Sequence, residues 1–238
     1  MTDLTLVQSE FVESVLRLTP RVAAFDCDGT LWSGDAGEGF FSWSMERGMV
    51  SEEIERWARA RYAEYRAGKV AEEIMCGEMV TMYRGLSEKV VQRATDEYFE
   101  LGIAPGIFPE MRELVEHLRA AGTDVWAVSS SNQWIIRSGM RSFGIPQNRI
   151  LAAETVVENG VIADRLIRVP SGPGKPEALR EVLASPPDCA FGNSLWDREL
   201  LATSTHPFAI NPSPELKEIA VASGWRIYQP AENHADGP

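Results

Sequence analysis

The most constraining feature of the sequence is an apolar run that ends in two aspartates, VAAFDCDGT at residues 22–30. Its first four residues lack polar alternation, which is typical of a strand buried on both faces of a parallel sheet. Asp26 and Asp28 stand two positions apart, so on extended backbone their side chains point the same way. Two carboxylates held this close repel each other unless a cation balances them or one is protonated. The stretch therefore predicts a buried strand that ends in a polar site.

This pair of carboxylates is suited to two kinds of chemistry. A divalent Mg²⁺ ion prefers oxygen ligands and would balance the two charges. One carboxylate can also act as a nucleophile while the other acts as general acid and base. Gly29 and Thr30, which follow at once, favour a tight turn whose backbone N–H groups could bind a phosphate.

The chain beyond residue 103 alternates predicted strands and helices, which indicates a parallel sheet with helices on both faces. Asn159-Gly160 stands between two β-branched runs and predicts a hairpin. We therefore expect the α/β class, with a Rossmann-like parallel sheet in a three-layer α/β/α core. The predicted strands after the first are 123–129, 149–154, 188–192 and 206–210, with a short one in WRIYQ.

Residues 34–102 interrupt this alternation with four stretches of helical spacing and no obvious strand. Ser51 and Ser87 each precede such a stretch and predict helix starts. We expect residues 1–33 and 103–238 to form the core and residues 34–102 to form an all-helical cap inserted after the first motif. A cap in this place would cover the carboxyl edge of the sheet, where such folds place their sites.

Three further motifs offer polar side chains at predicted strand ends or helix starts. Ser129, Ser130 and Ser131 run into a predicted helix start, which could bind an anion or could simply contain the helix cap. Lys175 begins a helix after a loop rich in glycine and proline, where its charge opposes the helix dipole. A nearby carboxylate or phosphate would remove this cost, or Lys175 is a solvated surface lysine. Asn193 and Asp197 follow the strand 188–192 and offer one amide and one carboxylate oxygen.

The net charge and the cysteine content indicate which classes of binding partner and which compartment fit this chain. The net charge is −12 and the pI about 4.8, which argues against nucleic acid or an anionic membrane surface as a main partner. The sequence shows no signal peptide and no apolar run long enough to span a bilayer. Three widely spaced cysteines without a CxxC pair fit a reducing compartment, so we expect a cytoplasmic protein, monomeric or homodimeric.

Taken in order, the four motifs resemble those of the haloacid dehalogenase superfamily. The first is DCDGT at residues 26–30, the second is Ser129 after VWAV, the third is Lys175, and the fourth is GNSLWD at residues 192–197. The helical insertion and the VSSSNQWII stretch are similar to the phosphoserine phosphatase-like branch. The resemblance spans residues 21 to about 210 and implies a Rossmannoid core with a helical cap.

The resemblance also implies roles for these residues. Asp26 would attack phosphorus and form an aspartyl-phosphate, and Asp28 would protonate the leaving oxygen and later activate water. Gly29, Ser129, Ser130 and Lys175 would hold the phosphoryl oxygens. Mg²⁺ would be held by the Asp26 carboxylate, the Asp28 backbone carbonyl and oxygens of Asn193 and Asp197.

Asn193 departs from the family pattern, which usually has Asp at this position. We expect the loss of this negative charge to weaken metal binding, and Asp197 to contribute more of the remaining binding. Asp35 lies where phosphoserine phosphatases carry a glutamate that meets the substrate amine, although it also fits a helix cap with Glu38 three residues on.

The expected function is therefore a Mg²⁺-dependent phosphatase acting on a small phosphorylated metabolite, with phosphoserine-like esters favoured. A second acid at position 28 argues for phosphomonoester chemistry, because dehalogenases lack it. Two alternatives stay open: a phosphotransferase or phosphomutase of the same superfamily, and a phosphometabolite-binding protein without turnover, which only Asn193 suggests.

Overall fold

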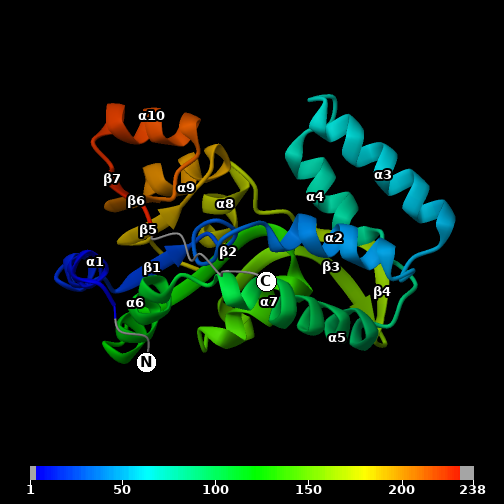
Figure 1. The fold of residues 1–238 in the computed structure, drawn as a ribbon, viewed down its shortest axis with the longest axis horizontal. Coiled ribbons are helices and arrows are strands. Elements are labelled where there is room, and N and C mark those ends of the chain that lie inside the picture. The colour runs from blue at the N-terminus through cyan, green and yellow to red at the C-terminus, as the bar shows by residue number, and fades with distance from the viewer. Residues whose placement is uncertain (1–3, 231–238) are drawn as a thin grey trace.

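Seven strands form one sheet in the order β4-β3-β2-β1-β5-β6-β7 in the computed structural model, which describes residues 4–230 (Figure 1). Neighbouring strands are parallel, except that β3 and β4 are antiparallel. The predicted Rossmann-like parallel core is confirmed. The strands are β1 (Val22–Phe25), β2 (Asp124–Asn132), β3 (Ile150–Glu158), β4 (Val161–Arg168), β5 (Cys189–Gly192), β6 (His206–Ile210) and β7 (Arg226–Tyr228).

Helices cover both faces of this sheet (Figure 1). β1 lies at its centre, and its alternating side chains enter two different cores: Ala23 and Phe25 pack on one face and Ala24 on the other. This explains why β1 reads as a continuous apolar run. The α-helices are α1 (Leu6–Leu16), α2 (Ala36–Glu46), α3 (Glu52–Arg66), α4 (Glu72–Thr81), α5 (Glu88–Tyr98), α6 (Pro109–Ala120), α7 (Gln133–Ser142), α8 (Gly174–Arg180), α9 (Arg198–Thr203) and α10 (Pro214–Ser223).

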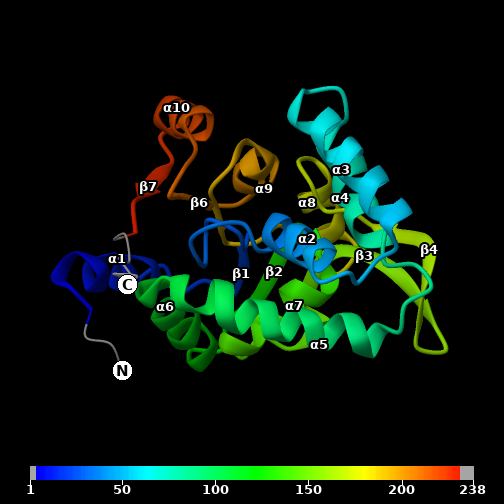
Figure 2. The ribbon, with the colours of Figure 1, turned by 45° about the vertical axis from the view of Figure 1, so that its right-hand side comes forward.

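The segment between β1 and α6 contains the helices α2 to α5, as the sequence predicts. α2 and α5 pack against α7, whereas α4 packs against α3 and lies over β2, β3 and β4. Figures 1 and 2 show α3 at the end of the molecule that carries β3 and β4. The division into a core and a cap at residues 33/34 and 102/103 stays a prediction. Residues 1–3 and 231–238, which it assigns to the core, lie outside the described residues.

Two local signals in the sequence are confirmed, the turn between β3 and β4 and the cap of α3. Asn159 and Gly160 have φ of 53° and 79° and connect β3 to β4 as the predicted hairpin. Ser51 caps α3 by accepting from the Ile54 N–H group, whereas Ser87 precedes α5 without such a bond. The hairpin also pairs with the connection between α4 and α5, because the Gly85 N–H group donates to the Ile162 carbonyl.

Candidate active site

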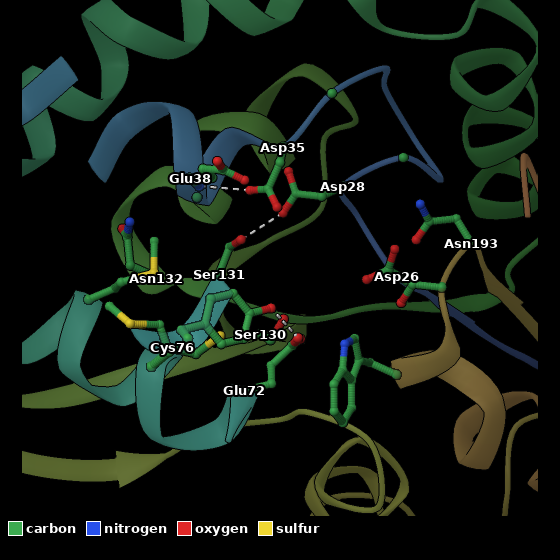
Figure 3. Close-up of a pocket in the computed structure, with 18 of the residues that line it drawn as sticks. Asp26, Asp28, Asp35, Glu38, Glu72, Cys76, Ser130, Ser131, Asn132 and Asn193 are labelled. Atoms are coloured by element: carbon green, nitrogen blue, oxygen red, sulfur yellow. Dashed lines mark hydrogen bonds between the residues drawn. The ribbon is translucent and has the colours of Figure 1, made fainter. Parts of the chain in front are cut away.

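The carboxyl ends of β1, β2 and β5 meet at one edge of the sheet and surround a cavity of about 470 Å³ (Figure 3). The Asp26 N–H group donates to the Phe191 carbonyl at 2.9 Å, which extends the β1–β5 ladder to the first aspartate. The structure therefore brings most of the predicted residues together. Those that line the cavity are Asp26, Asp28, Gly29, Asp35, Ser130, Lys175 and Asn193.

Asp26 is buried at the floor of this cavity and both of its carboxylate oxygens accept hydrogen bonds. Lys175 Nζ lies 2.6 Å from Oδ1, and the Thr30 hydroxyl donates to Oδ2 at 2.8 Å. Burial raises the pKa of Asp26 to about 7, and the nearby charge of Asp197 adds to this effect while Lys175 opposes it. One side of this carboxyl group is thus fixed by a cation in a site that otherwise disfavours negative charge.

Lys175 is not a surface lysine, since only 2% of it is exposed and it lies between two carboxylates. Its second partner is Asp197, whose Oδ1 is 2.5 Å from Nζ. Burial lowers the pKa of Lys175, but the charges of Asp197 and Asp26 outweigh it and raise the pKa above its usual value. The ammonium group therefore stays charged and positioned beside Asp26.

Asp197, a predicted metal ligand, is fully buried beside Lys175 and is not among the residues that line the cavity. Its Oδ2 accepts from the N–H groups of Asn193 and Ser194 and from the Ser194 hydroxyl, while Oδ1 faces Lys175. Both oxygens of this fully buried carboxylate are thus occupied by protein donors. The geometry makes Asp197 a positioning residue for Lys175 and for the loop after β5.

Asp28 points into the same cavity and is held by three donors. Oδ1 accepts from the Trp32 indole at 2.9 Å and from the Ala36 N–H group at 2.6 Å, and Oδ2 accepts from the Ser131 hydroxyl at 2.7 Å. Burial and the charge of Asp35 raise the pKa of Asp28 to about 7, against the lowering effect of its donors. A carboxyl group with a pKa near neutrality suits proton transfer in both directions.

The three serines at the end of β2 differ in whether they line the cavity. The strand continues to Asn132, beyond the predicted end at 129, and α7 begins one residue later. Ser130 and Ser131 line the cavity, but Ser129 does not, since it is buried and accepts from the Ser131 N–H group. The idea that a serine caps α7 is wrong, because Asn132 makes that cap through the Ile135 N–H group.

Asn193 lies directly against the turn that follows Asp28. Gly29 has φ of 72°, and a β-carbon there would be 1.9 Å from Asn193 Nδ2. Figure 3 shows the Asn193 side chain with its oxygen on the Asp26 side. Within residues 4–230, no three Asp, Glu, His or Cys side chains are grouped to hold a metal together. Carboxylate, amide and backbone oxygens still form a donor set that fits Mg²⁺.

Asp35 also lines the cavity and is the N-cap of α2. Its Oδ1 accepts from the Glu38 N–H group at 2.8 Å, so the helix-cap interpretation is confirmed. The Asp35 side chain is accessible from the cavity. Many protein atoms nevertheless surround its carboxylate, and this desolvation raises the pKa of Asp35. Figure 3 shows Asp35 close to Asp28.

The helices α3 and α4 contribute lining residues that the sequence did not single out as a site. Glu72 is buried there and accepts from the Tyr65 hydroxyl at 2.8 Å and from the Ser171 hydroxyl at 3.3 Å. It thereby connects α3 and α4 to the loop before Lys175. The lining from these helices consists of Tyr62, Tyr65, Arg66, Glu72, Met75, Cys76 and Met79.

A family model described as haloacid dehalogenase-like hydrolase matches residues 23–202. The chain belongs to the haloacid dehalogenase-like hydrolase family. The match begins within β1 and includes all four predicted motifs. The predicted family and the predicted enzyme class, a phosphatase of this family, are confirmed.

Two relatives that match most of the chain carry different names. One is a Streptomyces azureus protein named "Inhibition of morphological differentiation protein", 28% identical, with the match covering 87% of this chain and 78% of the relative. The other is a histidinol-phosphatase of Neisseria meningitidis, 26% identical, with 87% and 97% covered.

Two solved structures have a similar fold. A Bordetella pertussis protein of unknown function has a TM-score of 0.76 at 25% identity and covers 87% of this chain and 97% of its own. A substrate-bound phosphoserine phosphatase has a TM-score of 0.55 at 19% identity, with 83% and 89% covered.

No helix within residues 4–230 is both long and apolar enough to cross a membrane.

Proposed function

We propose that this chain is a Mg²⁺-dependent phosphatase that hydrolyses a small phosphomonoester through an aspartyl-phosphate intermediate. The observation that carries the proposal is the pair Asp26 and Asp28 in one cavity, with Lys175 Nζ 2.6 Å from Asp26. The two carboxyl groups have different partners, a cation for Asp26 and three neutral donors for Asp28. Different environments suit them to different roles.

In the first half of the reaction, an oxygen of Asp26 attacks phosphorus as the bond from phosphorus to the ester oxygen breaks. Asp28 gives its proton to that leaving oxygen, and the alcohol departs. In the second half, Asp28 takes a proton from water, the water oxygen attacks phosphorus, and the bond to Asp26 breaks. A pKa of about 7 lets Asp28 serve both steps near neutral pH.

Lys175, Ser130 and the backbone of the Gly29 turn are the groups proposed to hold the phosphoryl oxygens. All three line the cavity beside Asp26. Ser129 is less suited to this role than expected, because it lies outside the lining and its oxygen accepts from Ser131. Positioning and charge neutralisation by such groups supply most of the catalysis in phosphoryl transfer.

Mg²⁺ would be held by the Asp26 carboxylate, the Asp28 backbone carbonyl and the Asn193 amide oxygen. When bound, it would neutralise charge on the phosphoryl group and help to orient it. Asp197 is a weaker candidate than expected, since both of its oxygens already accept from protein donors.

Hydrolysis of p-nitrophenyl phosphate tests the proposal. We expect turnover with Mg²⁺ and loss of at least about a hundredfold after the metal is removed with EDTA, with recovery when Mg²⁺ is returned. Equal rates with and without the metal would contradict the metal dependence. Product analysis with an added acceptor alcohol distinguishes a hydrolase from a phosphotransferase, and absence of turnover on every ester would favour a binding protein.

We expect Asn193→Asp to tighten Mg²⁺ binding about tenfold, because it returns a negative charge beside Asp26. A metal titration followed by the melting temperature measures this without relying on activity, since a bound ligand stabilises the folded state. Asp188→Asn, at a carboxylate that instead bonds the start of β1, is the control and should leave the titration unchanged. Unaltered or weaker binding in Asn193→Asp would show that position 193 does not contact the metal.

A further inference from the structure

The three donors that hold the carboxyl group of Asp28 divide unevenly between its two oxygens. Oδ1 accepts from two N–H groups, the Trp32 indole and the Ala36 backbone. Oδ2 accepts from one hydroxyl, that of Ser131 (Figure 3). Since a carboxylate oxygen has two lone pairs in its plane, Oδ1 is filled, whereas Oδ2 keeps one position free. Asp28 and Ser131 both line the cavity, so this free position is the one available to a substrate.

The kinds of donor on the two oxygens differ as well. An N–H group can only donate, so the two at Oδ1 favour an unprotonated oxygen there. A hydroxyl can donate to an ionised carboxylate oxygen and accept from a protonated one. The bond between Ser131 and Oδ2 can therefore persist in both states, and Asp28 can lose and regain a proton at Oδ2 without losing its orientation.

Packing fixes the direction of the Trp32 N–H group. Trp32 is fully buried, and its ring meets that of Phe99 edge-on at a centroid distance of 5.2 Å. α7 approaches the indole at Gly139, where a β-carbon would be 2.9 Å from Trp32 Cη2. The indole thus has little freedom to turn, and support of this kind preorganises a catalytic group.

The first turn of α2 leaves space for the Ser131 hydroxyl. A β-carbon at Gly37 would lie 2.3 Å from Ser131 Oγ, much closer than two unbonded atoms can be. The backbone of Gly37 has no positive φ, and alanine is the better helix former, so the helix itself does not require glycine here. The position of the hydroxyl beside Asp28 does require it.

We infer that Trp32 and Ser131 are positioning residues that direct Oδ2 of Asp28 at the ester oxygen of the substrate. This inference rests on the proposed phosphatase function and adds two residues to it. In the first half-reaction, the proton on Oδ2 passes to the leaving oxygen as the bond from that oxygen to phosphorus breaks. In the second, Oδ2 takes a proton from the attacking water. Both residues act through Asp28.

Two esters of similar shape separate this role from general damage to the site. p-Nitrophenolate is stable as an anion and leaves with little help from an acid, whereas phenolate is more basic and gains from a proton. With Mg²⁺, we expect Ser131→Ala and Trp32→Phe to lower kcat/KM for phenyl phosphate by at least about tenfold, and for p-nitrophenyl phosphate by less than about threefold. A purely structural loss would lower both together.

The second half-reaction supplies an independent readout. Hydrolysis of the aspartyl-phosphate needs Asp28 to accept a proton from water, whichever ester formed the intermediate. With p-nitrophenyl phosphate, kcat and KM of both variants should therefore fall together. The fraction of phosphoprotein trapped by acid quench should rise above that of wild type.

Gly37→Ala tests the role of Ser131 without removing its hydroxyl. The added methyl group would force the hydroxyl to rotate away from Asp28. This variant should therefore lower kcat/KM for phenyl phosphate relative to p-nitrophenyl phosphate, as Ser131→Ala does. Together, these two variants decide the matter even if Trp32→Phe folds poorly.

Two matched controls remove the same kinds of bond from residues that do not line the cavity. Trp126→Phe removes a buried indole that donates to Asp124 at 3.0 Å. Ser138→Ala removes a buried hydroxyl that donates to Asp96 at 2.6 Å. Both should leave the ratio of the two kcat/KM values unchanged.

The outcomes distinguish this inference from the proposed function. If wild type hydrolysed both esters while Ser131→Ala and Gly37→Ala kept the wild-type ratio, the inference would be overturned and the phosphatase proposal would stand. Equal losses for the two esters would overturn it in the same way. A wild type that hydrolysed neither ester would overturn both, because Asp28 would then have no proton transfer to perform.

Discussion

Asp26→Asn is expected to abolish hydrolysis of p-nitrophenyl phosphate, with kcat lowered by at least about a thousandfold. The amide is a poor nucleophile, and its loss of charge also removes one proposed ligand of Mg²⁺. The fold should persist, because an asparagine oxygen can still accept from Lys175, which lies 2.6 Å from the present carboxylate. Steady-state kinetics and a melting curve on the same preparation measure the two effects separately.

The matched control for this variant is Asp164→Asn, at an exposed carboxylate of β4 that does not line the cavity. It removes the same charge and should leave kcat within about twofold. Phosphoprotein trapped by acid quench should be found in wild type and be absent from Asp26→Asn. If Asp26→Asn kept most of its kcat, another residue would have to be the nucleophile.

Lys175→Met is expected to lower both activity and stability. Removing the cation that bridges Asp26 and Asp197 leaves two buried carboxylates without this partner, which costs roughly 3–5 kcal/mol of unfolding free energy. For a chain of this size, that corresponds to a melting temperature about 10 °C lower. Activity should fall by at least about a hundredfold, since a charged donor to the phosphoryl group is lost as well.

Two further variants make this prediction specific. Lys217→Met removes an exposed lysine of α10 and should change neither property. Adding Asp197→Asn to Lys175→Met removes one of the uncompensated carboxylates and should recover part of the melting temperature without restoring activity. A Lys175→Met protein as stable as wild type would contradict this prediction and would mean that Asp26 and Asp197 do not need the cation, because one of them takes up a proton in the variant.

Much of the fold is predictable because it follows from local chemistry. The buried run before Asp26, the Asn159-Gly160 hairpin and the cap at Ser51 each depend on a few neighbouring residues. The end of β2 is less predictable. The pairing of β2 with β3 shifts its register between Val128 and Asn132, and the three serines lie within this irregular stretch. No local signal distinguishes an irregular strand end from a serine-capped helix.

The site is predictable where the motifs meet at strand ends, and less so where it depends on packing between distant segments. Asp26, Asp28 and Lys175 share one cavity as expected. The donors Trp32 and Ser131 to Asp28 were missed, although Trp32 lies four residues from Asp28 and could have drawn attention. Glu72 was missed for a different reason: its partner Ser171 is 99 residues away, and only the packing of α4 over the sheet joins them.

The central position of β1 has a consequence for how the chain reaches this structure. Ala23 pairs with Val125 on one side and with Cys189 on the other, so the middle strand is made early and finds its neighbours late. Pairing across such sequence separations is slow, and partly folded chains with unpaired apolar strands aggregate. During synthesis, VAAF can pair with β2 first but lacks its second partner strand until β5 has emerged from the ribosome, which makes this strand a natural segment for chaperones to shield.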